Sequence, residues 1–539
     1  MRKNFFYKIF LIFVTIFFTT ARANAAGEKI LFIPVDERPI SFKQTVDVLE
    51  QTGCEMILPP KDYFDRFGND ESPEKILSWL EENAPLADAA VISADAILYG
   101  GLIPSRKHEF SEDVLNARIN RIKSLRKKNP YLKIYLLCSL MRAPHEGSEG
   151  SVEEPDYYAK YGADIFTFTS LSDKSTSVGL TTNEREEMNT LGRNIPNEIF
   201  NDWYDRRRKN IAATKKFLNL TKEGIVSYLI VGRDDHWPFS QTHRESLELS
   251  YYAQINNIPS TKFQMLSGID EFGLLLLTRA VDDLRENSPK VYVDYNKGLG
   301  VDTVPTYSDE TVGVAIKSDL TITGGRIVKN PKAADFVLLV NTDPAGNTYH
   351  SHNALPNQRD ENFDYNAPRD GTKNFVDMVE RYVKKGYPVC VADITFANGS
   401  DNAMINLLKE RGLLFKLQAY AGWNTANNSL GFVIGTGILT RYMTKDAKNK
   451  LLATRYLDDW AYQANVRTTV GDWIFYNVPN GEKFYNGFGG KNIEIEERIT
   501  KLMQEFAAKN LPSYKFMRDF NVTCPWNRMF EIDIEFNEQ

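Results

Sequence analysis

The sequence predicts an α/β protein built mainly from parallel βαβ units, arranged in two lobes with a cleft between them. Short apolar runs alternate with longer segments of helical periodicity, which is typical of parallel sheets. Many of the apolar runs end abruptly in acidic residues, Arg, His or Asn. The chain has 539 residues, more than one hydrophobic core usually holds, so we expect more than one domain.

Residues 1–25 are predicted to be a secretory signal peptide. A basic start is followed by the apolar run Ile9–Phe18, which is too short to span a bilayer comfortably, and by the small-residue pattern Ala23-Asn24-Ala25. A retained membrane anchor is the alternative. We therefore expect an exported protein, periplasmic or extracellular, with no integral membrane segment after cleavage.

The first predicted domain, residues 27–287, alternates strands and helices. Apolar runs predict strands, whereas apolar residues three or four positions apart predict helices. Strands are expected at Lys29–Pro34, Glu55–Leu58, Ala89–Ser93, Lys133–Leu140, Asp164–Phe168, Ile225–Val231 and Lys262–Leu266. Helices are expected at Phe42–Gln51, Pro73–Asn83, Ser111–Lys128, Asn183–Leu218 and Glu271–Glu286. Because the strands approach eight, a (β/α)8-like barrel is the alternative for this lobe. The basic run Arg206–Lys209 is interpreted as a solvated helix face.

The second predicted domain, residues 288–440, repeats this pattern with shorter units. Its strands are expected at Val291–Tyr295, Ala334–Val340, Pro388–Ala392 and Phe415–Ala419. Its helices are expected at Lys373–Lys385 and Asn402–Arg411, while Thr311–Ile316 fits a helix or a strand. Residues 441–539 are predicted to be a mainly helical region packed on the second domain.

Composition limits the possible partners and cofactors. The net charge of −6 gives no basic footprint, so nucleic acid is not an expected partner. Cys54, Cys138 and Cys390 lie in or beside apolar runs, and Cys524 precedes a proline. No C-x-x-C pair occurs, so we expect free thiols and no thiolate zinc site. No H-E-x-x-H, G-x-S-x-G, Walker or dinucleotide-binding motif is present either.

Polar residues after parallel strands should gather at one edge of a sheet, where ligands bind in this class of fold. The sequence therefore predicts one acidic, polar pocket. The candidates for catalysis are Asp36, Glu37, Asp234, Asp235, Asp270 and Glu271. The candidates for substrate binding are Arg38, Asp95, Arg142, His145, Glu146, Arg233, His236, Asp343, Asp393, Asn398, Trp423 and Asn424.

Several of these candidates also have structural interpretations. Adjacent carboxylates at Asp234 and Asp235 can share acid/base work, because like charges raise one carboxyl pKa, but one of them can instead cap a helix. Asp270 can be the N-cap of the helix that follows it. Trp423, flanked by small residues and followed by Asn424, is suited to stack on a sugar, or alternatively to fill the junction between domains.

Four segments resemble one family. They are Val35-Asp36-Glu37-Arg38-Pro39, the Asp234-Asp235 pair, Gly268-Ile269-Asp270-Glu271 and Ala421-Gly422-Trp423-Asn424-Thr425. The chain resembles, over nearly its whole mature length, an uncharacterised bacterial domain-of-unknown-function family of exported α/β proteins. The resemblance implies one continuous architecture rather than a fusion, and it implies no activity.

Three functions fit these observations. The first is a glycan-active hydrolase of the cell envelope without a cofactor, in which two strand-end carboxyl groups act on a glycan or another polar small molecule. The second is a hydrolase of phosphate esters or amides that depends on a divalent cation. Its ligands would be Asp36, Asp95, Asp234 and Asp235, with His236 or His145 added. The third is a non-catalytic protein that binds a glycan or another solute.

Overall fold

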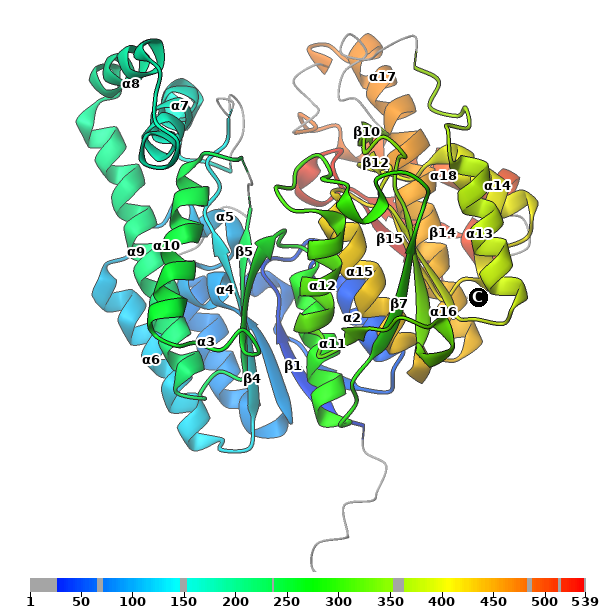
Figure 1. The fold of residues 1–539 in the computed structure, drawn as a ribbon, viewed down its shortest axis with the longest axis horizontal. Coiled ribbons are helices and arrows are strands. Elements are labelled where there is room, and N and C mark those ends of the chain that lie inside the picture. The colour runs from blue at the N-terminus through cyan, green and yellow to red at the C-terminus, as the bar shows by residue number, and fades with distance from the viewer. Residues whose placement is uncertain are drawn as a thin grey trace, which may run out of the picture.

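The computed structural model describes residues 27–64, 71–145, 153–234, 237–351, 363–481, 487–511 and 515–537. Two parallel sheets form two lobes that lie side by side (Figure 1). The predicted α/β class with parallel βαβ units is thereby confirmed. The predicted signal peptide, Glu146, Asp235 and His236 lie outside the described residues.

Sheet A forms the first lobe and consists of six parallel strands in the order β2-β1-β3-β4-β5-β6. In chain order they are β1 (Lys29–Ile33), β2 (Glu55–Ile57), β3 (Ala89–Ser93), β4 (Lys133–Leu140), β5 (Tyr228–Arg233) and β6 (Phe263–Ser267). The helices beside it are α2 (Lys43–Glu50), α3 (Ser72–Asn83), α4 (Ala94–Tyr99), α5 (Leu102–Ser105), α6 (Glu112–Lys128), α9 (Asn197–Lys222), α10 (Gln241–Ile255) and α11 (Phe272–Leu284). Within the described residues the sheet ends at β2 and β6, so it is an open sheet rather than the alternative barrel.

The long connection between β4 and β5 carries two further helices, α7 (Tyr158–Ser177) and α8 (Thr182–Asn194), which rise above the sheet in Figure 1. The predicted strand Asp164–Phe168 is wrong, because this segment belongs to α7. Buried Tyr158, Ile165 and Thr169 recur at helical spacing, and they outweigh the short apolar run.

Arg206 and Arg207 correct another expectation, since both are buried rather than solvated on the helix face. Arg207 donates 2.7 Å hydrogen bonds from Nε and Nη2 to the carboxylate of Glu245. It also donates to the backbone carbonyls of Met141 at 2.7 Å and Arg142 at 2.9 Å. Arg207 therefore fixes the chain where it leaves β4.

Sheet B forms the second lobe, with five parallel strands in the order β13-β11-β9-β7-β8. They are β7 (Lys290–Tyr295), β8 (Arg326–Ile327), β9 (Phe336–Asn341), β11 (Val389–Asp393) and β13 (Ala419–Ala421), and β10 (Tyr349–His350) pairs with β12 (Phe396–Ala397) beside them. The helices are α12 (Val312–Ile322), α13 (Thr372–Lys384), α14 (Asn402–Glu410) and α15 (Ala426–Leu439). The predicted boundary near Ser288 falls between β6 and β7. The last strand begins later than predicted, because residues Leu414–Lys416 form a 3-10 turn.

The two sheets share one strand order. Numbered along the chain within its own lobe, sheet B reads 2-1-3-4-5 from its β8 edge, and sheet A reads the same with a sixth strand added. Segments that follow strands of both sheets, such as α7 in the first lobe and β10 in the second, lie at the same end of the molecule (Figure 1). The carboxyl edges of the two sheets therefore lie on the same side.

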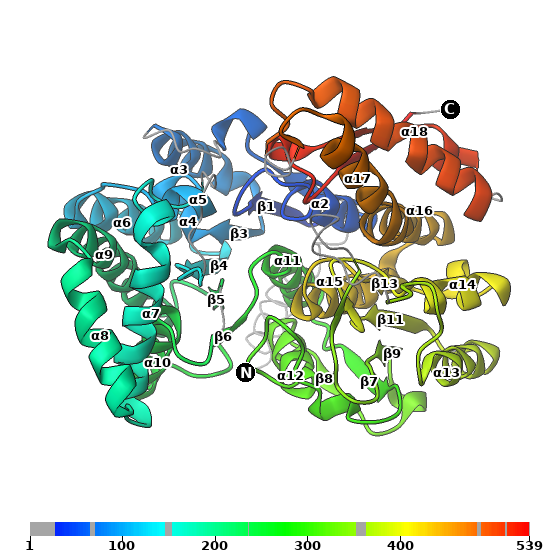
Figure 2. The same cartoon turned by 90° about the horizontal axis from the view of Figure 1, so that it is seen from above.

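Helices α11 and α15 lie between the sheets and join the lobes (Figure 2). One apolar core includes residues of sheet A, both helices and sheet B, for example Phe32, Leu274 and Leu338. The helices approach closely at Gly435, where an added Cβ would lie 2.9 Å from Leu274 Cγ. The lobes are thus packed on each other through a common core.

The C-terminal region is mainly helical, as predicted. It consists of α16 (Lys445–Arg455), a π-helix (Tyr456–Val466), α17 (Arg467–Asn477) and α18 (Asn492–Asn510), and it ends in the antiparallel pair β14 (Phe520–Thr523) and β15 (Asp533–Phe536). It packs on the second lobe but also returns to the first, where Lys43 Nζ donates to Asp533 at 2.5 Å. Within the described part of the chain, no helix combines the length and apolar character needed to cross a membrane. The four cysteines are buried and unpaired.

Candidate functional site

A cavity of about 270 Å³ lies at the carboxyl edge of sheet A, and the second lobe and the C-terminal segment supply its other walls. Its charged lining consists of five arginines (Arg38, Arg106, Arg142, Arg233 and Arg528) and three acidic residues (Glu153, Asp234 and Asp270). Its other lining residues are Leu102, Ile103, Gly268, Ile269, Tyr307, Asn424, Thr425, Asn427, Asn428, Trp526 and Phe530. This position agrees with the rule that ligands of parallel sheets bind beyond the carboxyl ends of the strands.

Strand register brings several of these residues together. Leu140 at the end of β4 pairs with Arg233 at the end of β5, and Arg233 pairs with Ser267 at the end of β6. The chain leaves all three strands at one level, so Arg142, Asp234 and Asp270 follow at the same edge. These three residues were predicted from the sequence, and the structure brings them into one cavity.

Arg38 organises the wall nearest β1. Its Nε donates to Asp36 at 2.8 Å, and its Nη2 donates to Asp270 at 2.6 Å. Asp270 accepts a second hydrogen bond, at 3.2 Å, from Asn428 of the other lobe. The alternative in which Asp270 caps α11 is wrong, because Glu271 holds the N-cap position and makes no side-chain cap. Asp36 is buried behind Arg38 and does not line the cavity.

Glu153 lies within a cluster of three arginines. Arg142 donates to it at 2.9 Å, Arg106 donates at 3.3 Å, and Arg528 forms a further ion pair with it. Burial alone would raise the pKa of Glu153, but the three guanidinium groups outweigh that effect and hold its pKa well below the usual range. Arg106 also forms an ion pair with Asp234.

Arg233 connects the two lobes across the cavity. Its Nη2 donates to Asp309 at 2.8 Å and to Glu310 at 2.6 Å, both in the second lobe, and to Ser267 at 3.0 Å. Arg233 was predicted to bind substrate. It does line the cavity, but most of its hydrogen bonds go to these acidic residues.

Aromatic side chains of the later chain form the opposite wall. The indole Nε1 of Trp526 donates to Glu37 at 2.6 Å, and the guanidinium of Arg528 lies 4.5 Å from its ring centroid. Burial, and then the neighbouring Asp36, raise the pKa of Glu37. Tyr307 is 47% exposed and offers the most accessible ring of the wall. Glu37, a predicted catalytic residue, lies behind Trp526 rather than in the cavity lining.

Asp95 is buried rather than part of the cavity lining. It accepts hydrogen bonds from the backbone N–H and the hydroxyl of Ser139, both at 2.9 Å. Burial raises the pKa of Asp95 to about 7, even though these hydrogen bonds oppose the shift. The charge of Asp234 adds to the shift, so Asp95 interacts electrostatically with the cavity wall.

Glu271 turns into the joint between the lobes instead of into the cavity. Its side chain lies against Gly431 of α15 and Gly268, where an added Cβ would come within 2.0 Å of Glu271 Oε1. Neither carboxyl oxygen has a hydrogen-bond partner among the described residues. Burial, followed by the charge of Asp319, raises the pKa of Glu271 well above its usual range.

Other predicted binding residues also lie outside this cavity. Asp343 accepts hydrogen bonds from its own loop, from the backbone of Ala345 at 3.0 Å and of Asn347 at 3.3 Å. The ring of His145 stacks on Trp237, with the ring centroids 5.1 Å apart. The backbone N–H of Asn398 donates to the carbonyl of Asn424 at 2.7 Å.

Trp423 is a core residue rather than a platform for a sugar. It is 3% exposed and meets Phe530 in a T-shaped contact at 5.9 Å. The alternative, in which it fills a junction, fits this position. Its neighbour Asn424 does line the cavity, as predicted.

Asp393 belongs to a separate buried network at the carboxyl edge of sheet B. It accepts hydrogen bonds from Asn341 at 3.0 Å, Tyr420 at 2.8 Å and the backbone of Asp401 at 2.8 Å. Burial, and then the charge of Asp401, raise the pKa of Asp393 to about 7. It is completely buried, so it serves this network and not the cavity.

Sequence reasoning missed much of the cavity wall. Arg106 follows two short helices after β3, and Glu153 lies in a polar loop. Trp526 and Arg528 come from the last segment of the chain, after Pro525. None of these residues directly follows an apolar strand-like run. Glu153 had a local signal, because it belongs to an acidic run in the long polar stretch His145–Tyr161, and long polar insertions after strands are often active-site loops.

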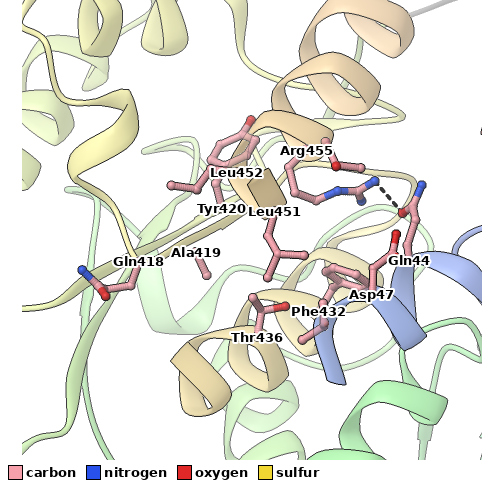
Figure 3. A pocket seen from close by; sticks show the side chains of 12 residues that line it. Gln44, Asp47, Gln418, Ala419, Tyr420, Phe432, Thr436, Leu451, Leu452 and Arg455 are labelled. Atoms are coloured by element: carbon pink, nitrogen blue, oxygen red, sulfur yellow. Dashed lines mark hydrogen bonds between the residues drawn. The ribbon is translucent and has the colours of Figure 1, made fainter. Parts of the chain in front are cut away.

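A second cavity lies at the lobe joint among α2, α15, α16 and β13 (Figure 3). Its volume is about 20 Å³, room for roughly one water molecule, whereas a sugar ring needs far more. Arg455 crosses it and donates to Gln44 at 2.6 Å (Figure 3). A larger cavity, of about 670 Å³, lies among α2, α16 and β15. The 270 Å³ cavity is the candidate functional site because it lies at the carboxyl edge of sheet A and six of the predicted site residues line it.

Among the described residues, no group of three or more His, Cys, Asp and Glu side chains is arranged to hold a metal ion. Of the ligands proposed for the metal-dependent alternative, Asp36 and Asp234 are paired with arginines and Asp95 with Ser139.

Comparison with known proteins gives a family whose function is unknown. A family model described as "Protein of unknown function (DUF4127)" matches residues 30–535. No curated protein and no solved structure matches the chain.

Proposed function

Since the chain belongs to the DUF4127 family, whose function is unknown, we propose its function from the cavity: an exported glycan-active hydrolase. One observation carries the proposal. Acidic residues that follow the adjacent strands β5 and β6 share a cavity with aromatic and amide side chains of the other lobe. Carboxyl groups, amides and aromatic rings are the groups that bind sugar hydroxyls and sugar faces.

Asp234 and Asp270 are the proposed pair of carboxyl groups at the scissile bond. Glycoside hydrolysis needs two carboxyl groups on opposite sides of that bond, about 5–5.5 Å apart for retention and about 6.5–9.5 Å for inversion. Adjacent strands lie about 4.8 Å apart, so side chains that leave β5 and β6 reach separations of this order. Glu37 and Asp95, with raised pKa values, support the pair from behind the wall as proton-holding groups.

The test measures release of reducing ends from cell-envelope glycans by the mature protein. Asp234→Asn and Asp270→Asn should each lower turnover by about 10²–10⁴-fold, because each removes a group that transfers a proton or attacks the sugar. The melting temperature should change little, since neighbouring carboxylates still pair with Arg106 and Arg38. Full activity in both variants would contradict the proposal.

A non-catalytic binding protein is the second candidate, favoured by one observation. Each of the three carboxylates lining the cavity is paired with an arginine, an arrangement suited to a rigid binding wall. Under this alternative, glycan binding is tight and no product forms. Asp234→Asn would then weaken binding with no turnover to lose.

A further inference from the structure

We propose that the cavity recognises an anionic group, a carboxylate or a phosphate, on its glycan ligand, and that Arg142 is the residue that binds it. The inference rests on the proposed glycan-binding function and specifies its substrate class. Five guanidinium groups and three carboxylates line a cavity of about 270 Å³. Guanidinium groups are suited to carboxylate and phosphate, because their N–H donors match two oxygens at once.

Arg142 is the most exposed arginine of this wall, so its remaining donors can reach a ligand. Its side chain is 26% exposed, against 12% for Arg528 and 9% for Arg233. All three nitrogens of Arg528 contact Glu153 or Glu531. Arg142 donates from Nε to Glu154 at 2.6 Å and from Nη2 to Glu153 at 2.9 Å. Its Nη1 has no hydrogen-bond partner within the described part of the chain. Among the described residues Arg106 Nε also lacks a partner, but the side chain of Arg106 is only 2% exposed, and that of Arg38 is 6% exposed.

The surroundings hold Arg142 in a fixed position. Glu153 and Glu154 fix its guanidinium plane, and Arg207 binds the carbonyls of Met141 and Arg142. Arg207 is itself 1% exposed and is paired with Glu245. A guanidinium held in this way loses little conformational entropy when it binds an oxyanion.

Acidic residues behind the wall change how an anion would be recognised. Asp36, Glu154 and Glu531 are buried around the arginines, so the site as a whole is not strongly positive. Recognition would therefore depend on directed hydrogen bonds from Arg142 rather than on net charge. An anion held there would also orient the sugar relative to Asp234 and Asp270 in the same cavity.

The test measures binding of D-glucuronate, D-glucose and inorganic phosphate to the mature protein by calorimetry. We expect glucuronate to bind at least tenfold more tightly than glucose. Arg142→Gln should remove this preference and leave glucose affinity unchanged. The matched control is Arg208→Gln, which changes an exposed arginine on α9 and should alter neither affinity. Should Arg142→Gln fail to fold, Arg142→Lys, which keeps the charge but loses the paired donors, should show a partial loss.

The outcomes separate this inference from the proposed function. If glucose binds as tightly as glucuronate, or if Arg142→Gln weakens both sugars equally, the role of Arg142 in anion recognition is overturned while glycan binding stands. If phosphate binds through Arg142 and neither sugar binds, anion recognition stands and the glycan function falls. If none of the three binds, both proposals fall.

Discussion

The carboxyl edges of the two sheets differ in what covers them, although the sheets share one strand order. At the edge of sheet A, Asp234 and Asp270 line an open cavity. At the edge of sheet B, Asp393 is fully buried, and Asp459 of the π-helix accepts a 2.7 Å hydrogen bond from the backbone of Gly422 just after β13. The same strand-end position thus gives an open cavity in one lobe and a sealed polar core in the other.

This difference shows which part of a site the strand pattern determines. Parallel strands bring polar residues to one edge, but later segments of the chain decide whether solvent reaches them. In sheet B the π-helix closes the edge, and the backbone carbonyl of Asp459 accepts from Ser400 at 3.0 Å. In sheet A the later segment around Trp526 forms one wall of the cavity and leaves it open.

The largest effect on stability is expected from Arg455, which lies in the sealed network. It is 4% exposed, donates to Asp458 at 2.6 Å and lies 3.4 Å from Asp459. Arg455→Met should lower the free energy of unfolding by about 3–5 kcal/mol, because it leaves buried acidic residues without their counter-charge. Arg142→Gln, at the open edge, should cost less, about 1–2 kcal/mol, because Arg106 still pairs with Glu153 and Glu154. Denaturant unfolding of both variants measures the contrast, and equal losses would contradict the distinction between an open and a sealed edge.

The sequence predicted the positions of the strands better than it predicted which strand-end residues reach solvent. Apolar runs located β1, β3, β4 and β9 to within about two residues, because fully buried strands leave continuous hydrophobic stretches. The prediction of a strand at Asp164–Phe168 was wrong, because residues buried at helical spacing over a longer segment outweighed the short apolar run.

The residues of the candidate site were also predicted only in part. Arg38, Arg142, Asp234 and Asp270 were found because each closely follows a strand. Asp393 obeys the same rule but is sealed by a helix more than sixty residues later in the chain. Trp526 contributes from the C-terminal segment, and no local pattern connects it with strands near the N-terminus. Long-range packing of this kind leaves no periodic signal in a single sequence.

A pH-dependent contribution to stability is expected from Asp95, below the open edge. Its pKa is about 7 when folded, against about 3.9 for an ordinary Asp, so the folded state holds a proton that the unfolded state releases. The resulting stabilisation is complete below about pH 4 and is lost as the pH rises through 7, by up to about 4 kcal/mol. In Asp95→Asn the amide can accept from the Ser139 N–H and donate to its hydroxyl, so this part of the pH dependence should disappear. Unfolding at a series of pH values measures it.

The matched control for this measurement is Asp62→Asn, which removes an exposed carboxyl group and should leave the pH dependence contributed by Asp95 in place. Asp393 cannot serve in the same way, because its carboxylate accepts from three donors and an amide would place N–H against N–H. An unchanged pH dependence in Asp95→Asn would show that its carboxyl is not the titrating group.

A smaller effect than that of Arg455 is expected from one hydroxyl in the sealed edge. Tyr420 Oη lies 2.8 Å from Asp393 Oδ2 and 2.6 Å from Ser400 Oγ, so its single proton goes to the carboxylate and the serine hydroxyl can donate to it. Tyr420→Phe removes both contacts but keeps the ring, and Asp393 retains its hydrogen bonds from Asn341 and Asp401. The free energy of unfolding should therefore fall by about 1–2 kcal/mol, with ligand binding at the edge of sheet A unchanged. Calorimetric binding and thermal unfolding of one sample measure both quantities. A loss of binding at preserved stability would show that the two edges are coupled through the shared core of α11 and α15, and that the sealed network helps to shape the open site.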